Sequence, residues 1–379
     1  MKILFLDQTG KIGGAELALL DVVKPYRQSS LVGLFEDGPF RERLEQHGIS
    51  VEILMPDPLE VKKDSGVVQG LRSIGKLLPL VSRVAKASSS YDLIYANTAK
   101  ALVVGALASA ASGRPLVYQL HDILSEEHFS RSNIRLLVFL SNRFASQVIA
   151  DSKATKAAFI AAGGRPELVE SVYYGFEPED YKDLSPAPRD VRAALNLEDR
   201  FVIGHFSRLS PWKGQDVLID ALSDCPKDIE VLLVGDALFG EDEYVAKLHR
   251  QVADLNLEDR VHFLGFRTDV AQLMAACDLV AHTSTAPEPF GRVIVEAMLC
   301  GTPVVAAAAG GAAELVENGE TGWSTPPGDS LALAEAIKTC YAQPDLAAAI
   351  AKRGQAQSAK RFDMDTINNE MASLLAGVL

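Results

Sequence analysis

Cysteine is scarce in this sequence, and an excess of positive charge is absent. The 379 residues include four cysteines: Cys225, Cys277, Cys300 and Cys340. They are widely separated and form no C-x-x-C pair, which favours reduced, buried thiols over disulfides or a zinc site. With 37 basic against 50 acidic residues, the formal net charge is −13, which argues against binding to nucleic acid through bulk charge.

Long apolar segments are also missing. The longest apolar run, 101–111, is too short to span a bilayer and is interrupted by Gly105 and Ser109. Met1 and Lys2 lead directly into a strand-like segment, without the pattern of a signal peptide. Because 48% of the residues are hydrophobic and 23% are charged, the chain can still bury full cores. These features predict a soluble, cytoplasmic protein of two or three domains.

Short β-type segments alternate with longer helical patterns along the chain. We expect strands at 2–7, 31–35, 51–54, 92–96, 116–120, 147–151, 170–174, 201–206, 230–234, 261–264, 279–283 and 303–306. Short apolar strands separated by amphipathic helices predict parallel sheets covered on both faces. Two such series predict two Rossmann-like domains. Proline and glycine cluster at 175–190, which places the boundary there, and a last helix is expected from 361 to about 377.

The segment 288–305 is the most informative part of the chain. Gly291 allows a turn between Glu288 and an apolar helical segment, which predicts a helix that starts at 291–292. The free amides and positive dipole end of this helix suit an anion such as a diphosphate. Glu296 would lie about a turn and a half inside the helix. A buried carboxylate there needs a hydrogen-bond partner such as the vicinal diol of a ribose, and a solvated glutamate is the alternative.

Two cations follow the expected strand 201–206. Arg208 and Lys213 flank a proline-containing loop at the edge where open α/β sheets bind ligands. Arginine binds phosphate oxygens in bidentate fashion and lysine acts as a point charge, so the pair would neutralise a departing diphosphate. Two solvated loop cations are the alternative.

Two further features lie at the ends of expected strands in the first half. Gly13 and Gly14 would let the backbone approach a phosphate or sugar, although the G-x-G-x-x-G spacing of a dinucleotide site is absent. His121 ends the strand at 116–120, where a structural role and a catalytic role are both open. The acid pair Asp363 and Asp365 begins the last helix, which favours helix capping over a metal-diphosphate site.

Together, these motifs resemble the retaining glycosyltransferases of family 4 over essentially the full chain. The resemblance rests on Gly13-Gly14, Arg208 with Lys213-Gly214, Phe263-Leu264-Gly265-Phe266, the segment from Glu288 to Glu296, Gly310-Gly311 with Glu314, Gly319, and Thr321-Gly322. It implies the α/β GT-B fold, in which two Rossmann-like parallel-sheet domains face a central cleft. An acceptor-side domain would comprise 1–177 and 361–379, and a nucleotide-sugar-binding domain 178–360.

The resemblance also implies roles for single residues. Glu296 would hold the ribose hydroxyls, Arg208 and Lys213 the diphosphate, and Glu288 the hydroxyls of the donor sugar. His121 would contact the sugar near its anomeric centre. The implied catalytic residues are His121, Glu288, Arg208 and Lys213. The implied donor contacts are Gly13, Gly14, Arg208, Lys213, Arg267, Glu288, Phe290, Gly291, Arg292, Val293 and Glu296.

The expected activity is that of a metal-independent, retaining hexosyltransferase without a cofactor. It would transfer a sugar from a nucleotide sugar to a glycan or lipid-linked acceptor in polysaccharide or glycoconjugate biosynthesis. Lys11-x-Gly13-Gly14 resembles the loop of glycogen and starch synthases, which favours UDP-glucose and leaves ADP-glucose, GDP-mannose and other UDP-sugars open. A front-face substitution, without a carboxylate nucleophile, is the mechanism implied. The alternatives are an epimerase or phosphorylase of the same fold, or a catalytically silent nucleotide-sugar-binding scaffold.

Two features depart from the family pattern or extend it. The family usually has Asn-Gly after the last strand of the first domain, whereas this chain has Tyr174-Gly175. The segment 61–90 carries six basic residues and one acid, and Val67, Leu71, Ile74 and Leu78 form a helical stripe within it. Weak peripheral contact with an anionic membrane through 62–86, at the inner face of the plasma membrane, is therefore a hypothesis beside an ordinary solvated helix.

Overall fold

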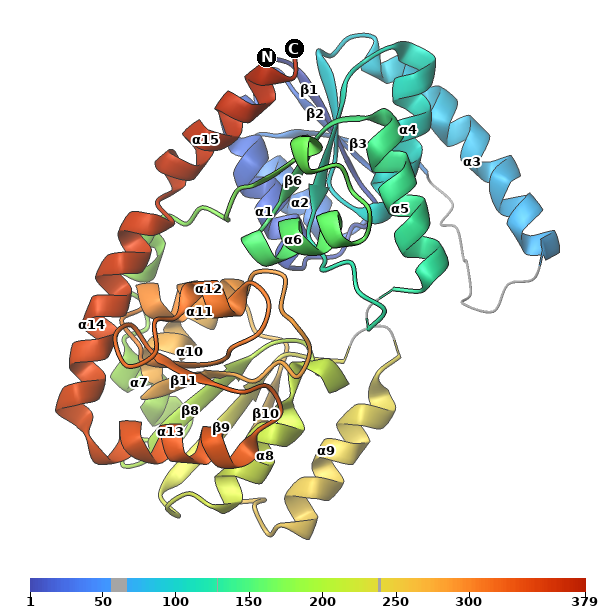
Figure 1. Ribbon diagram of the computed structural model, residues 1–379. Coiled ribbons are helices and arrows are strands. Elements are labelled where there is room, and N and C mark those ends of the chain that lie inside the picture. Colours follow the sequence, from blue (N-terminus) through green and yellow to red (C-terminus); the bar gives the residue numbers. More distant parts are fainter. Residues whose placement is uncertain (56–66, 128, 238–239) are drawn as a thin grey trace. The chain divides into compact units, whose positions relative to one another are not determined.

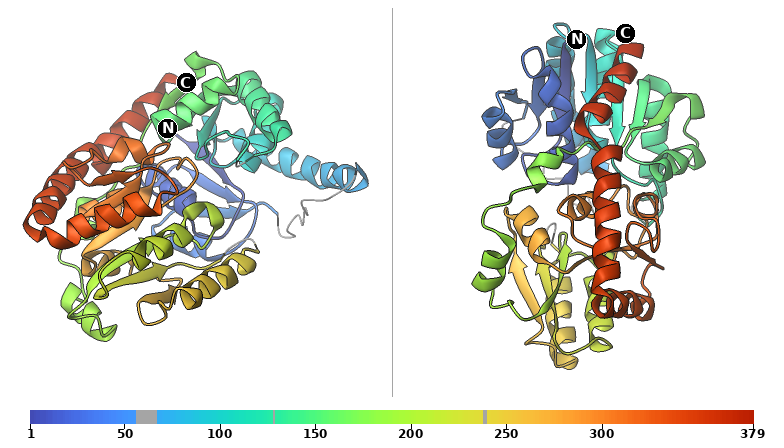
Figure 2. Two further views of the ribbon diagram at one scale, coloured as in Figure 1. Left: turned by 60° about the horizontal axis from the view of Figure 1, so that its bottom comes forward. Right: turned by 90° about the vertical axis from the view of Figure 1, so that its left-hand side faces the viewer.

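The computed structural model describes residues 1–55, 67–127, 129–237 and 240–379 (Figure 1). They form two compact units: residues 1–175 with 364–379, and residues 176–363. These limits differ by two or three residues from the limits expected from the sequence. The chain therefore passes from one unit to the other at 175–176 and again at 363–364 (Figure 2).

The first unit is built on a seven-stranded parallel sheet. Its strands are β1 (Ile3–Asp7), β2 (Leu31–Leu34), β3 (Ser50–Ile53), β4 (Leu93–Ala96), β5 (Leu116–Leu120), β6 (Ala145–Ala150) and β7 (Val169–Ser171). They pair in the order β3-β2-β1-β4-β5-β6-β7. The strand order reverses between β1 and β4, and ligands of open α/β sheets bind outside the carboxyl ends of the strands at such a point.

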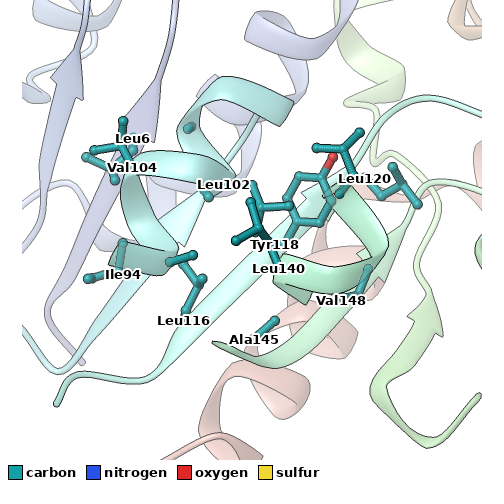
Figure 3. Close-up of a cluster of buried hydrophobic side chains, with 14 of the residues drawn as sticks. Leu6, Ile94, Leu102, Val104, Leu116, Tyr118, Leu120, Leu140, Ala145 and Val148 are labelled. Atoms are coloured by element: carbon teal, nitrogen blue, oxygen red, sulfur yellow. The ribbon is translucent and has the colours of Figure 1, made fainter. Parts of the chain in front are cut away.

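Helices cover both faces of this sheet because alternate residues of each buried strand point to opposite sides. Leu4 and Leu6 share a core with α3 (Val67–Ser88), α4 (Ala99–Ser112), α5 (Arg131–Phe144) and α6 (Lys153–Ala161). Ile3 and Phe5 share the other core with α1 (Gly14–Val23), α2 (Pro39–Gln46) and α15 (Met364–Gly377). Figure 3 shows part of the first core, where Leu102 of α4 and Leu140 of α5 lie over Tyr118.

The second unit repeats the design with six parallel strands. They are β8 (Phe201–Phe206), β9 (Ile229–Val234), β10 (Val261–Gly265), β11 (Leu279–His282), β12 (Val304–Ala307) and β13 (Trp323–Thr325), in the order β10-β9-β8-β11-β12-β13. The helices are α7 (Pro188–Ala194), α8 (Gln215–Ser223), α9 (Asp242–Asp254), α10 (Val270–Ala276), α11 (Arg292–Leu299), α12 (Ala312–Leu315), α13 (Ser330–Ala342) and α14 (Pro344–Arg361). The order reverses between β8 and β11, so the loops after these two strands flank the expected ligand position.

The predicted strands are confirmed within a few residues at each end, and two details of the prediction are wrong. The strand β13 was not predicted, because its three residues mix tryptophan with two hydroxyl side chains and show no apolar run. The helix expected from 361 begins at Met364, because α14 occupies the chain up to Arg361. None of the helices among the described residues has the length and apolarity that a membrane span requires.

Candidate active site

The loops after β8 and β11 are fastened to one another in the second unit. Gly214 has φ +69°, and a Cβ atom there would lie 2.0 Å from the carbonyl oxygen of Thr283. The Thr283 hydroxyl lies 2.8 Å from the carbonyl oxygen of Gly214 and 3.0 Å from that of Lys213. Only glycine fits this close approach in the left-handed region, so the pattern Lys213-Gly214 reflects the junction of two loops. The junction fixes where Lys213 leaves the backbone.

Glu288 is the best-connected carboxylate of these loops. Lys213 Nζ donates to both of its oxygens, at 2.9 Å to Oε1 and 2.8 Å to Oε2. Ser284 Oγ donates to Oε2 at 2.7 Å, and His282 Nε2 lies 3.1 Å from the same oxygen. Burial acts to raise the pKa of Glu288, but the Lys213 ammonium and the His282 hydrogen bond outweigh it and hold the pKa below its ordinary value. Glu288 is therefore a stabilised anion.

The two oxygens of Glu288 differ in how many further hydrogen bonds they can accept. Oε2 has three polar neighbours, whereas Oε1 has Lys213 alone among the hydrogen bonds described. A carboxylate oxygen accepts about two hydrogen bonds, so Oε1 can accept one more. Lys213 carries three N–H groups, of which two are directed at Glu288, and the third can reach a further anion. The pair thus presents one acceptor and one charged donor.

The backbone around Glu288 is held by the loop after β12. The amide of Gly311 donates to the carbonyl oxygen of Glu288 at 2.6 Å, and a Cβ on Gly311 would lie 2.1 Å from the carbonyl oxygen of Pro289. The Phe290 ring is buried, stacked on Phe176 at 6.4 Å between centroids. The Phe290 side chain therefore belongs to the core.

The helix α11 begins where the sequence predicts. Gly291 precedes Arg292 with φ +102°, which confirms the expected turn. Glu296 lies on the second turn with 15% of its side chain exposed, and Arg292 Nε approaches its Oε1 at 3.4 Å. The Arg292 guanidinium lies 4.7 Å from the centroid of the Phe176 ring. Arg292 is thus directed along its own helix towards Glu296, and Val293 is half-buried on the first turn.

The predicted cations Arg208 and Arg267 have aromatic or acidic neighbours. Trp212 lies close to both Arg208 and Lys213, with the Arg208 guanidinium 5.7 Å and Lys213 Nζ 3.9 Å from a ring centroid. Arg267 donates to both oxygens of Asp269, at 2.7 and 2.5 Å. Phe266, beside Arg267, is a large apolar side chain that is 65% exposed.

In the first unit, the Gly13 amide has a partner within the chain. Glu16 is the third residue of α1, and its carboxylate returns to the backbone N–H of Gly13, as in a capping box. Burial raises the pKa of Glu16 to about 7, with the nearby Asp7 carboxylate as a further cause. Burial likewise raises the pKa of Asp7 to about 6. In the structure the Glu16 carboxylate lies at the Gly13 amide, and the expected contact of Gly13 and Gly14 with a phosphate stays a prediction.

His121 is held at both ring nitrogens. Its Nδ1 lies 2.6 Å from the hydroxyl of Tyr174, and its Nε2 lies 2.8 Å from Oδ1 of the buried Asn97. Asn97 follows β4, beside the reversal of strand order. His121 and the two glycines thus belong to the first unit, and the other predicted residues belong to the second.

Several polar residues were missed by sequence reasoning. His282 and Ser284 hold Glu288, and His205 Nε2 lies 2.9 Å from the Thr283 hydroxyl. Burial, with the charges of His282 and Lys213 as further causes, lowers the pKa of His205 to about 3, so this imidazole is neutral. Both histidines stand near the carboxyl end of a central strand, and this place in the sequence is the signal that points to them.

Family comparisons agree with this arrangement of two sheets and two sets of loops. The model of glycosyl transferases group 1 matches residues 188–357, and that of the glycosyl transferase 4-like domain matches residues 13–175. Among solved structures, Anabaena Alr3699/HepE in complex with UDP-glucose is 58% identical, with 100% of both chains covered and a TM-score of 0.93. The chain belongs to glycosyltransferase family 4.

Two other proteins are similar to this glycosyltransferase at lower sequence identity. The GDP-mannose-dependent alpha-(1-6)-phosphatidylinositol monomannoside mannosyltransferase of Mycolicibacterium smegmatis is 28% identical over 312 residues, which cover 79% of this chain and 80% of that one. Sucrose-phosphate synthase of Thermosynechococcus elongatus has a TM-score of 0.83 at 22% identity, covers 100% of this chain and 98% of that one, and shows the shared fold alone. The glycosyltransferase therefore has the GT-B fold, with two parallel-sheet Rossmann-like domains.

Proposed function

We propose that this glycosyltransferase transfers glucose from UDP-glucose, with retention of the anomeric configuration and without a metal ion, to a glycan or lipid-linked acceptor in polysaccharide or glycoconjugate biosynthesis. The observation that carries the donor is the full-length identity of 58% with Alr3699/HepE, which was solved with UDP-glucose, with UDP and glucose, and with UDP. Identity at this level over whole chains supports the same donor, whereas the acceptor is supported only as a class.

The state of Glu288 supports a front-face substitution. A carboxylate that accepts bonds from Lys213, Ser284 and His282 has its charge stabilised, which makes it a poor nucleophile towards an anomeric carbon. The same stabilisation suits an acceptor of hydrogen bonds from sugar hydroxyls. In this proposal the leaving phosphate takes the proton of the acceptor hydroxyl, the new glycosidic bond forms on the face that the phosphate leaves, and UDP is released.

The cations of the second unit support a reaction without a metal ion. Arg208 and the third N–H of Lys213 would offset the charge that develops on the departing diphosphate. The amides at the start of α11, after Gly291, would add the positive end of a helix dipole. Glu296 would accept bonds from the ribose hydroxyls.

Calorimetric titration with UDP-glucose, ADP-glucose and GDP-mannose tests the donor. We expect UDP-glucose to bind at least about tenfold more tightly than the others, which corresponds to about 1.4 kcal/mol. Excess EDTA should leave turnover unchanged, and NMR of the product should show an α-glucoside. Conversion of UDP-glucose to another sugar nucleotide without an acceptor would indicate an epimerase, a requirement for free phosphate a phosphorylase, and binding without turnover a silent scaffold.

We also propose weak contact with an anionic membrane, through a surface that includes residues beyond 62–86. Lys62 and Lys63 lie outside the described residues, and Arg83 pairs with Glu52 at 2.7 Å. The helices α3, α4 and α5, which share one core on one face of the sheet, together carry eight basic residues and no acidic residue. Among the side chains that the structure describes on these helices, four large apolar ones are exposed: Leu78, Leu107, Leu136 and Phe139. Basic groups beside exposed leucine and phenylalanine favour an anionic lipid surface.

The helix α5 offers the cleanest test of this contact. Arg135 and Arg143 are exposed, and Phe139 is 60% exposed between them. We expect the protein to sediment with vesicles that contain phosphatidylglycerol and not with phosphatidylcholine alone. Arg135→Glu/Arg143→Glu should weaken this binding about 30-fold or more, at about 1 kcal/mol for each basic residue lost.

The matched control makes the same change of charge in the second unit. Lys227 and Arg250 are both exposed, and Lys227→Glu/Arg250→Glu should leave vesicle binding near that of the wild type. Equal loss in both double variants, or no preference of the wild type for anionic lipid, would contradict contact through the α3–α4–α5 face.

A further inference from the structure

Tyr174 lies between His121 and Asp151 in a chain of hydrogen bonds. Its hydroxyl oxygen lies 3.0 Å from Asp151 Oδ2 and 2.6 Å from His121 Nδ1. At the other side of the imidazole, Asn97 Nδ2 donates to Asp7 Oδ2 at 2.6 Å. The chain Asp7–Asn97–His121–Tyr174–Asp151 lies entirely within the first unit.

The orientation of Asn97 decides where one proton of His121 lies. The two N–H groups of the Asn97 amide are directed at Asp7 Oδ2 and at the carbonyl oxygen of Ala15, at 2.6 and 3.2 Å. Its Oδ1 therefore faces His121 Nε2, at 2.8 Å. Because an amide oxygen only accepts hydrogen bonds, His121 Nε2 must carry a proton.

The Tyr174 hydroxyl then decides the second proton. It has one hydrogen, and the acceptors within its reach include His121 Nδ1 and Asp151 Oδ2. When the hydrogen is directed at Nδ1, the imidazole is neutral. When it is directed at Asp151, Nδ1 must itself be protonated to bond the hydroxyl oxygen, and His121 is a cation. When His121 takes up one proton from solvent, the one rearrangement needed is rotation of the Tyr174 hydroxyl towards Asp151. The Asp151 carboxylate then stabilises the positive charge of the imidazole.

Other titratable groups surround this chain of hydrogen bonds. Asp7 lies beyond Asn97 on β1, and Glu16 of α1 lies close to Asp7 and to Asp122. His121 and Tyr174 line a cavity of about 20 Å³, large enough for one water molecule. The other titratable or polar side chains that line it are Asp21, Tyr95, Asn97, Gln119, Tyr173 and Asn368. The residues of α15 that line the cavity are uncharged, and the acidic residues named above lie on β1, α1 and the loops after β5 and β6.

We propose that Tyr174 is a positioning residue, which holds the imidazole of His121 and couples its charge to Asp151. With this hydroxyl in place, protonation of His121 Nδ1 is more favourable than with a side chain that cannot hydrogen-bond to both Nδ1 and Asp151. The effect of Tyr174 on sugar transfer rests on the proposed function, in which His121 contacts the donor sugar. The effect of Tyr174 on the titration of His121 is independent of that function, because the contacts of the hydroxyl with His121 and Asp151 are present in the protein without a ligand.

The test is the titration of His121 in the ligand-free, full-length protein labelled with ¹⁵N-histidine. Long-range ¹H–¹⁵N spectra give the ring nitrogens, and the His121 signal is assigned by its loss in His121→Gln. We expect Tyr174→Phe to move the titration midpoint of His121 to lower pH by about one unit or more. Asp151→Asn should move it in the same direction, and the double variant should add little. The signals of the other histidines report whether the fold is kept.

Tyr95→Phe is the matched control. It removes another hydroxyl at the same cavity, one that donates to Gln119 at 2.6 Å. The midpoint of His121 should stay at its wild-type value in this variant. An unchanged midpoint in Tyr174→Phe, or an equal shift in Tyr95→Phe, would overturn the proposal.

The pH profile of UDP release from UDP-glucose links the titration to catalysis. The profile of Tyr174→Phe should shift in the same direction as the NMR midpoint, while the Kd for UDP stays within about twofold of wild type. A profile that does not move while the NMR midpoint does would limit Tyr174 to the resting protein and overturn its part in the reaction. Wild-type protein that neither binds nor cleaves UDP-glucose would instead refute the proposed function and leave the titration result intact.

Discussion

Lys213→Ala is expected to release UDP from UDP-glucose about 10²- to 10³-fold more slowly than the wild type, at a saturating donor concentration. The loss corresponds to one preorganised charged donor that acts on the diphosphate as it departs. Two N–H groups of Lys213 are directed at Glu288, so the variant also releases the carboxylate that would hold the donor sugar. Single-turnover kinetics on UDP-glucose measures the effect and separates it from product release.

The same substitution should destabilise the second unit. The side chains of Lys213 and Glu288 are only 15% and 10% exposed, so removal of the lysine leaves a buried charge whose remaining hydrogen-bond partners in the described part of the chain are His282 and Ser284. Breaking a buried pair on one side costs about 3–5 kcal/mol, which lowers the melting temperature by about 10 °C. Slow turnover could then arise from unfolding, and this must be separated from catalysis.

A double variant separates the two. In Lys213→Ala/Glu288→Gln the uncompensated charge is removed, so we expect thermal stability to recover while turnover stays low. Lys247→Ala removes a lysine that is 57% exposed and paired with Asp216, and should change stability by less than about 1 kcal/mol and leave turnover unchanged. Recovery of turnover in the double variant would show that Lys213 acts only by neutralising Glu288.

The sequence predicts the sheets well because buried parallel strands are short apolar runs with clear ends. β8 and β11 are such runs, and the polar loops after them place Arg208, Lys213 and Glu288 at one edge of the sheet. Gly291 and the start of α11 were predictable for a local reason, since a left-handed residue before an apolar helical pattern favours glycine.

The pairing of side chains was not predictable in the same way. The ion pair of Lys213 with Glu288 joins residues 75 positions apart, and it depends on which strand lies beside β8. His282 ends the apolar strand β11, and this position points to the site but does not reveal Glu288 as its partner. The bond from Glu16 to the Gly13 amide is local, and the acid three residues after the glycine could have indicated a capping box. Tyr174 was noticed only as a departure from the family pattern, and its role depends on three separate loops.

Glu296→Ala should weaken the binding of UDP by about 1.5–3 kcal/mol, a loss of about 10- to 150-fold in affinity. The carboxylate is mostly buried on α11, and its Oε1 lies 3.4 Å from Arg292 Nε. A hydrogen bond between a charged group and the ribose hydroxyls is worth this amount when the site is shielded from water. Calorimetry with UDP alone measures it without a contribution from the sugar.

Glu296→Gln and Glu335→Ala complete this test. Glutamine keeps the size and one acceptor oxygen but loses the charge, so its loss of affinity should lie between that of the wild type and that of alanine. Glu335 lies on α13 of the same unit with 73% of its side chain exposed, and its removal should leave the Kd for UDP unchanged.

Because Arg292 would lose its acidic neighbour in Glu296→Ala, Arg292→Ala must be measured as well. If Arg292→Ala alone weakens UDP binding as much as Glu296→Ala does, Glu296 acts by orienting the arginine; if it does not, the carboxylate itself binds the ribose.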